Sequence, residues 1–153
     1  LLDVLEEMVL RSCTIKKNVV EKDPTEQGER ALLNFGHTIG HAIEKAKNFS
    51  LTHGECISLG MVAAAFISWK RDKISMETYY EVRDMFVPFY LPISIDDIDA
   101  QEILKLTKSD KKAEAGTIKF ILLNRIGQAV IDKTVTDKEI LEAIKEIIFV
   151  EED

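Results

Sequence analysis

The sequence is poor in cysteine, in proline and in positive charge, and each shortage excludes a class of protein. Its two cysteines, Cys13 and Cys56, are too few for a disulfide-stapled secreted domain, and their spacing is not that of a zinc site. We therefore expect a reducing, cytoplasmic environment. Seven Gly and three Pro exclude collagen-like and low-complexity chains. A net charge of −7, with acidic residues spread along the chain, argues against a nucleic-acid partner.

Long hydrophobic runs are also missing. The longest apolar stretch, residues 56–69, is too short to cross a bilayer and contains two Ser and a Gly, so we expect no membrane partner. No signal peptide is visible. What is present is an ordinary globular composition, with 46% hydrophobic and 31% charged residues. A chain of 153 residues can bury one sizeable core, so we expect residues 1–153 to form a single domain.

The spacing of the apolar residues predicts a mainly α fold, a helical bundle-like domain with one small β-hairpin near the C-terminus. The hairpin is expected from two alternating segments, residues 117–123 and 129–135, with a turn between them. Asp23 and Glu26 have capping-box spacing at the start of the second helix, and Thr136 and Glu139 have it at the start of the last. The third helix is apolar nearly all round and should be central. Predicted helices cover residues 2–21, 23–47, 54–70, 75–87, 100–108 and 137–148.

The chain opens in the middle of an amphipathic pattern. Residues 1–8 already read as helix, with no initiator Met and no capping residue before them. We therefore expect upstream residues that have been removed or that belong to another domain.

All three histidines fall within seventeen positions of one another. His37 and His41 are four residues apart, which places them on one face of the predicted second helix, where two imidazoles can approach one ion. His53 stands at the start of the next helix. From this spacing alone, a solvated or hydrogen-bonded pair and a metal site both remain open.

Other polar residues of the predicted second helix favour a functional site. At about 100° per residue, one face of this helix collects Arg, Asn and His, which are recognition groups, whereas a solvated face usually carries Lys and Glu. Basic residues elsewhere, Lys16 and the pair Lys111-Lys112, are candidates for binding a phosphate or carboxylate, although each also fits an ordinary surface charge. The residues of this polar face are Glu26, Arg30, Asn34, His37, His41 and Glu44.

Two glycines also lie in this predicted helix. Gly36 and Gly40 each cost up to about 1 kcal/mol relative to Ala at a helix interior position. Close approach of a ligand and close approach of another helix both offset this cost, and we favour helix packing.

A longer ordered set of residues resembles a known family. Residues 30–44 read Arg-Ala-Leu-Leu-Asn-Phe-Gly-His-Thr-Ile-Gly-His-Ala-Ile-Glu, and His53-Gly54-Glu55 and Gly60-Met61 follow. Together with Lys16, Glu26 and the segment Asp110-Lys111-Lys112, they closely resemble the signature of 3-dehydroquinate synthases. The resemblance covers essentially the whole chain and implies the family's carboxyl-terminal, mainly helical domain.

The resemblance also implies cofactors and residue roles. In the family, an amino-terminal domain binds NAD, and a divalent metal, zinc or cobalt, lies between the domains. His37 and His53 would bind the metal with a Glu from the amino-terminal side, a domain absent from this chain. Glu26 and His41 would accept protons. The implied substrate contacts are Lys16, Arg30, Asn34 and one of Lys111 and Lys112.

The implied reaction suits these residue types. A NAD- and metal-dependent lyase converts 3-deoxy-D-arabino-heptulosonate 7-phosphate to 3-dehydroquinate and phosphate, in the shikimate pathway to aromatic amino acids. A metal polarises the alcohol and then the carbonyl, His or a carboxylate takes protons, and Arg and Lys neutralise the substrate's acidic groups. We expect a homodimer for the full-length enzyme and no activity for this chain alone.

Three other interpretations remain at this point. Other sugar phosphate cyclases use much the same metal site, although Arg30 with Asn34 favours the dehydroquinate-forming branch. Metal-dependent alcohol dehydrogenases of the glycerol dehydrogenase type also carry paired His on a helix, but they lack the Asn-Phe-Gly-His-Thr start and the Asp-Lys-Lys segment. The chain also fits a folded but inactive helical module.

Overall fold

The computed structural model describes residues 1–109 and 117–150, which form two compact units. The first unit is Leu1–Asn34 and the second is Phe35–Asp153. Lys111 and Lys112 lie outside the described residues. Within the described ranges, no helix combines the length and the apolar character needed to cross a membrane.

The first unit contains one long helix and one short one. Helix α1 covers Leu2–Lys22 and the 3₁₀ helix η1 covers Glu29–Asn34. Asp23 organises the turn between them, because its Oδ1 accepts a hydrogen bond from the Gln27 amide at 2.9 Å and its Oδ2 accepts from Gly28 and Arg30 at 2.8 and 3.0 Å. These backbone bonds stabilise the carboxylate and lower the pKa of Asp23 below its ordinary value.

The expectation of one continuous helix over residues 23–47 is wrong. Asp23 and Glu26 form no capping box, since Asp23 bonds the amides that follow and Glu26 has a positive φ of 57°. Gly36 follows η1 with a positive φ of 81°, which interrupts the helical backbone. A separate helix, α2, then covers His37–Ala46. The six polar residues therefore do not share one helix face. Glu26, Arg30 and Asn34 belong to the first unit; His37, His41 and Glu44 belong to the second.

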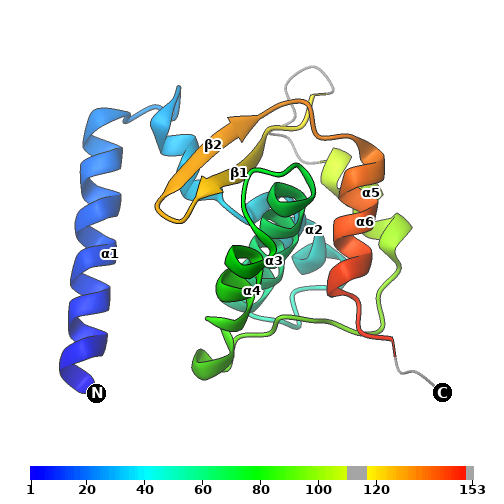
Figure 1. The fold of residues 1–153 in the computed structure, drawn as a ribbon, viewed down its shortest axis with the longest axis horizontal. Helices are drawn as coiled ribbons and strands as arrows, with labels where there is room; N and C mark the ends of the chain where they lie inside the picture. The colour runs from blue at the N-terminus through cyan, green and yellow to red at the C-terminus, as the bar shows by residue number, and fades with distance from the viewer. Residues whose placement is uncertain (110–116, 151–153) are drawn as a thin grey trace. The chain divides into compact units, whose positions relative to one another are not determined.

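The second unit is built around helix α3, His53–Lys70, which contacts α2, α4, α6 and strand β1 (Figure 1). Apart from Met61, every residue from Cys56 to Ser68 is buried, so the expected central position of this helix is confirmed. The other helices are α4 Met76–Asp84, η2 Val87–Phe89, α5 Ala100–Lys108 and α6 Asp137–Ile147. Helix α4 stops before the expected residue 87, and Pro88 lies inside the short 3₁₀ helix η2.

The β-hairpin near the C-terminus is confirmed. Strands β1, Phe120–Arg125, and β2, Gln128–Asp132, pair antiparallel, and Gly127 turns the chain between them at φ 83°. Ser68 of α3 ties the hairpin to the core, because its Oγ accepts from the Leu123 amide at 2.9 Å and donates to the Ala64 carbonyl at 2.8 Å. The fold is therefore mainly α with one small hairpin, as the sequence predicted.

Glycines allow α2 and α3 to touch backbone to backbone. A Cβ on Gly40 would lie 2.8 Å from Ile57 Cδ1 and 3.0 Å from the Cys56 carbonyl oxygen. A Cβ on Gly60 would lie 1.8 Å from the Gly36 carbonyl oxygen. Helix packing is therefore a reason for both glycines, as expected, since a Cβ on Gly36 would lie 2.8 Å from the Ile57 carbonyl oxygen. Gly36 differs in lying just before α2 rather than inside a helix.

An ion-pair network holds the end of α3 to the hairpin and to α6. Arg71 caps α3 and is 20% exposed. Its Nε donates to Glu139 Oε1 at 2.6 Å, and its Nη1 donates to Asp132 Oδ2 at 3.0 Å. The bond from Arg71 is the main cause that lowers the pKa of Glu139 from 4.5 to about 2.

We expect Glu139→Gln to lower the free energy of unfolding by about 2 kcal/mol at pH 7, because a Gln keeps the capping box but loses the ion pair. A carboxylate with a depressed folded-state pKa stabilises the fold above pH 4.5, and this contribution disappears as the pH falls towards 2. The difference between variant and wild type should therefore shrink over that range. Urea unfolding between pH 7 and pH 2 measures it, with exposed Glu142→Gln as the control. A difference that stays constant with pH would contradict the assignment.

Candidate functional site

The three histidines of the chain meet in the second unit. His37 is the first residue of α2, His41 follows one turn later, and His53 is the first residue of α3. Their ring centroids lie 5.1 Å apart for His37 and His41, 5.4 Å for His37 and His53, and 5.8 Å for His41 and His53. The structure thus forms a triangle of imidazoles from two helices.

Local structure fixes where both helices begin. Thr52 and Glu55 form a capping box at the start of α3, in which the Thr52 amide donates to Glu55 Oε2 at 2.8 Å and the Glu55 amide donates to Thr52 Oγ1 at 3.4 Å. The bonds from Thr52 lower the pKa of Glu55. Gly36 begins α2 and touches α3 through Gly60. The histidines are therefore held at two helix starts whose positions are set by backbone contacts.

Two of the imidazoles present Nδ1 to an oxygen that can only accept. His37 Nδ1 lies 3.2 Å from the Phe35 carbonyl oxygen, and His53 Nδ1 lies 3.0 Å from Glu44 Oε1. In both rings Nδ1 must therefore carry the hydrogen, which leaves the lone pair of the neutral ring on Nε2. This is the arrangement in which metal-bound imidazoles in proteins are usually held.

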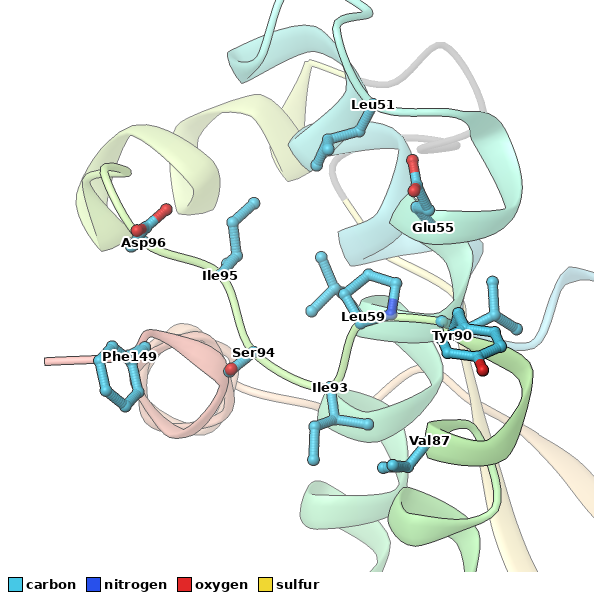
Figure 2. Close-up of a pocket in the computed structure, with 12 residues that line it drawn as sticks. Leu51, Glu55, Leu59, Val87, Tyr90, Ile93, Ser94, Ile95, Asp96 and Phe149 are labelled. Atoms are coloured by element: carbon cyan, nitrogen blue, oxygen red, sulfur yellow. The ribbon is translucent and has the colours of Figure 1, made fainter.

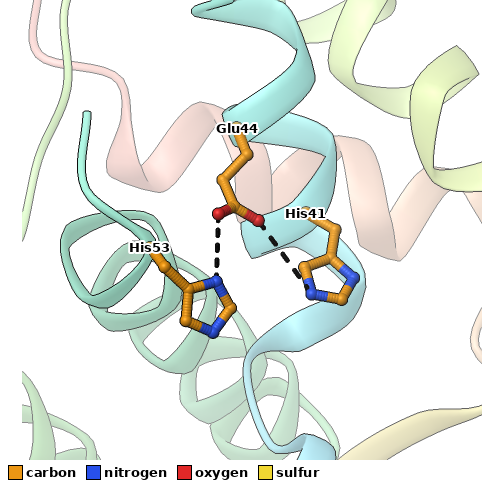
Figure 3. Close-up of side chains that lie close together, drawn as sticks. All are labelled: His41, Glu44 and His53. Atoms are coloured by element: carbon orange, nitrogen blue, oxygen red, sulfur yellow. Dashed lines mark hydrogen bonds and ion pairs between the residues drawn. The ribbon is translucent and has the colours of Figure 1, made fainter. Parts of the chain in front are cut away.

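Glu44 lies between the imidazoles of His41 and His53, as Figure 3 shows. Its Oε2 lies 4.0 Å from His41 Nε2, while its Oε1 contacts His53. Among the described residues, His41, Glu44 and His53 offer ligand atoms within 4.8 Å of one another, a grouping that could hold a metal ion. The sequence placed Glu44 on the polar face but gave it no role. Its contact with His53 joins two different helices, so the spacing of residues along one helix could not predict it.

The donor set fits a divalent transition metal. Zinc and cobalt take imidazole nitrogen and carboxylate oxygen, and two imidazoles bound tetrahedrally at about 2.1 Å place their ring centroids about 5 Å apart. The three ring separations, 5.1 to 5.8 Å, all lie near this distance. The ring spacing therefore fits one ion without selecting which imidazoles bind it, and the ligand atoms that lie within 4.8 Å of one another among the described residues are those of His41, Glu44 and His53, not of His37.

The first unit holds four other predicted site residues. Glu26 Oε1 accepts a short hydrogen bond from Asn34 Nδ2, so these two side chains form a pair. Arg30 Nη1 donates to the Pro24 carbonyl oxygen at 2.6 Å, and Lys16 is exposed on α1. The turn at Asp23 thus brings a carboxylate, an amide and a guanidinium into one short segment.

Cys56 lies within one turn of His53 but is not part of this chemistry. The thiol is fully buried, and burial, helped by the charges of Glu44 and Glu55, raises its pKa to about 11. Because the thiolate is the reactive and metal-binding form, Cys56 is a core residue.

A separate open groove of about 700 Å³ lies elsewhere on the second unit (Figure 2). Its wall is mostly apolar, and its two carboxylates, Glu55 and Asp96, have no Lys, Arg or His among the other lining residues. The lining residues are Leu51, Glu55, Leu59, Val87, Tyr90, Leu91, Pro92, Ile93, Ser94, Ile95, Asp96 and Phe149.

Comparison with solved structures finds the same fold in two sugar cyclases. The 2-deoxy-scyllo-inosose synthase complexed with carbaglucose-6-phosphate, NAD+ and Co2+ has a TM-score of 0.75 and 26% identity, with 87% of this chain and 39% of that chain covered. The 2-epi-5-epi-valiolone synthase of Streptomyces hygroscopicus subsp. jinggangensis, with NAD+ and Zn2+ bound, has a TM-score of 0.75 at 23% identity, with 85% and 36% covered.

Sequence comparison identifies the family more specifically. The 3-dehydroquinate synthase of Ruminiclostridium cellulolyticum is 38% identical over 142 residues, which cover 93% of this chain and 39% of that relative. The chain thus spans about two fifths of the length of the proteins it matches. The family described as 3-dehydroquinate synthase C-terminal matches residues 2–113. The chain therefore belongs to the 3-dehydroquinate synthase C-terminal family.

Proposed function

We propose that this chain is the metal- and substrate-binding part of a 3-dehydroquinate synthase. Together with an amino-terminal NAD-binding domain, it would convert 3-deoxy-D-arabino-heptulosonate 7-phosphate to 3-dehydroquinate and phosphate. The names and identities of the relatives support this reaction. The observation that carries the proposal is the triangle of imidazoles, in which His37 and His53 both have Nδ1 against an acceptor.

His37 and His53 are the proposed metal ligands, and a carboxylate from the amino-terminal side completes the set. Zinc is the metal we favour, since imidazole nitrogen and carboxylate oxygen suit it, and Co2+, which is bound in the neighbour at 26% identity, takes the same donors. When bound, the ion supplies Lewis acidity that polarises the alcohol and the carbonyl of the substrate.

The remaining residues bind the substrate and move protons. His41 accepts a proton, because Glu44 at 4.0 Å stabilises the imidazolium that forms. Glu26 is a second acceptor, and its bond with Asn34 orients the carboxylate. The proposed contacts to the carboxylate and phosphate groups of the substrate are Lys16, Arg30, Asn34 and one of Lys111 and Lys112.

A second candidate function is that of another sugar phosphate cyclase. The two solved neighbours carry other synthase names, and metal ligands alone do not select the sugar. Phosphate release from a panel of sugar phosphates, by a protein that includes the nucleotide-binding domain, separates the two candidates.

Titration with Co2+ or Zn2+ tests the metal assignment in this chain directly. We expect weak binding by the wild-type chain, because two imidazoles leave the coordination shell incomplete, and at least about tenfold weaker binding by His37→Ala. His41→Ala is the matched control, one turn away on the same helix, and should bind as the wild type does. Tight stoichiometric binding that His37→Ala leaves unchanged would mean that the ligands are wrong.

A further inference from the structure

Glu44 occupies a position that the proposed roles leave unexplained. It lies on the last part of α2, its side chain is only 14% exposed, and both of its carboxylate oxygens face imidazoles. Oε1 is 3.0 Å from His53 Nδ1 on α3, and Oε2 is 4.0 Å from His41 Nε2 on its own helix (Figure 3). One carboxylate thus connects a proposed metal ligand to the proposed proton acceptor.

The contact with His53 has a chemical consequence. His53 is 58% exposed, so packing alone does not hold its ring in one orientation. A carboxylate accepts hydrogen bonds and donates none, so Glu44 selects the ring form that carries the hydrogen on Nδ1. The lone pair then lies on Nε2, and the ring plane is fixed by a bond to a different helix.

We infer that Glu44 is a positioning residue of the metal site: it holds His53 in the tautomer and orientation in which Nε2 faces the ion. This inference rests on the proposed function, since it assumes that His53 is a ligand. It deepens that function, because the metal affinity then depends on a carboxylate that does not itself touch the metal. Outer carboxylates of this kind change metal affinity by about 10- to 100-fold.

The alternative role for Glu44 is that of a direct ligand, grouped with His41 and His53. The two roles differ in what a Gln can replace. The amide oxygen of Gln still accepts from His53 Nδ1 and keeps the ring orientation, whereas a neutral amide is a poor substitute for a carboxylate ligand. Comparison of Glu44→Gln with Glu44→Ala therefore separates a positioning residue from a ligand.

The first experiment records the imidazole tautomers of the metal-free chain by long-range ¹H–¹⁵N NMR at a pH where the rings are neutral. We expect His53 to carry its hydrogen on Nδ1 in the wild type and in Glu44→Gln. In Glu44→Ala it should change to the form with hydrogen on Nε2, which free imidazole side chains favour. The same form in all three proteins would overturn the inference, whatever the chain does with metal.

The second experiment titrates the same proteins with Co2+. We expect Glu44→Ala to bind about 10- to 100-fold more weakly than the wild type, and Glu44→Gln to recover most of that loss. Glu102→Ala removes an exposed carboxylate from α5 and controls for the change in net charge. Equal losses in the Gln and Ala variants would make Glu44 a ligand and overturn the positioning role, as would unchanged affinity in Glu44→Ala.

These outcomes are distinct from a failure of the proposed function. If His37→Ala leaves Co2+ affinity unchanged, the ligand assignment fails. If His37→Ala lowers the Co2+ affinity but the His53 tautomer is the same with and without the Glu44 carboxylate, the ligand assignment is supported and the positioning role of Glu44 is wrong.

Discussion

Gly60→Ala is expected to lower the free energy of unfolding by at least about 3 kcal/mol. The added Cβ would lie 1.8 Å from the Gly36 carbonyl oxygen and 2.8 Å from the Gly40 amide nitrogen. Both atoms are backbone, so no side-chain rotation relieves the overlap, and α2 must move away from α3. Overpacking a tight core costs about 1–3 kcal/mol and occasionally more, and an overlap between two backbones belongs at the upper end of this range. Urea unfolding followed by circular dichroism measures the loss.

Gly54→Ala provides a control on the same helix. Gly54 lies in the first turn of α3, and a Cβ there would meet nothing within 4 Å. Alanine should therefore be neutral or stabilise the fold by up to about 1 kcal/mol, because it restricts the unfolded chain and favours helix. If Gly60→Ala were as stable as Gly54→Ala, the close backbone contact that we describe between α2 and α3 would be contradicted.

The regular parts of the fold could be predicted because local pattern and tertiary environment agree in them. The segment from Cys56 to Ser68 is apolar on every side, and a helix with that pattern has to lie in the interior. The hairpin follows from alternating residues and a turn, and the last helix follows from the capping box of Thr136 and Glu139. In these segments each residue prefers the conformation that the whole fold requires.

The break before α2 could not be predicted, because its causes lie outside the local pattern. Helical spacing runs on through residues 23–47, but a Cβ on Gly36 would lie 2.7 Å from the Met61 amide nitrogen, a contact that the sequence does not reveal. The three hydrogen bonds that backbone amides donate to the Asp23 carboxylate likewise form only in the folded turn.

The same distinction applies to the candidate site. The spacing of His37 and His41 along one helix indicated that their rings meet, and the start of α3 supplied His53. The partner of His53 could not be found in this way, since Glu44 is nine residues away and reaches it across two helices. Spacing along the sequence predicts which side chains share a helix face. The tautomer of His53 depends instead on a contact between two helices.

His41→Ala should slow the proposed reaction by about 10²-fold or more while the metal content stays nearly intact, whereas His37→Ala should lose the metal. The two residues are one turn apart, and their rings lie 5.1 Å apart, so general damage to the site would affect them alike. Their surroundings differ. His37 has Nδ1 against the Phe35 carbonyl oxygen, which suits its proposed role as a ligand through Nε2, whereas His41 has Nε2 beside the Glu44 carboxylate, which would stabilise a transferred proton in its proposed role.

The proposed reaction also needs the proposed NAD-binding domain. Because the chain corresponds to 39% of the Ruminiclostridium cellulolyticum relative, the variants are assayed in a chimera with the amino-terminal part of that protein, and the unmodified chimera is the reference. Steady-state phosphate release and metal analysis are measured on both variants. Equal metal loss in the two would make His41 a ligand and would favour the site of the metal-dependent alcohol dehydrogenases. Intact metal with a slow reaction in His41→Ala alone would separate proton transfer from metal binding within a single turn of α2.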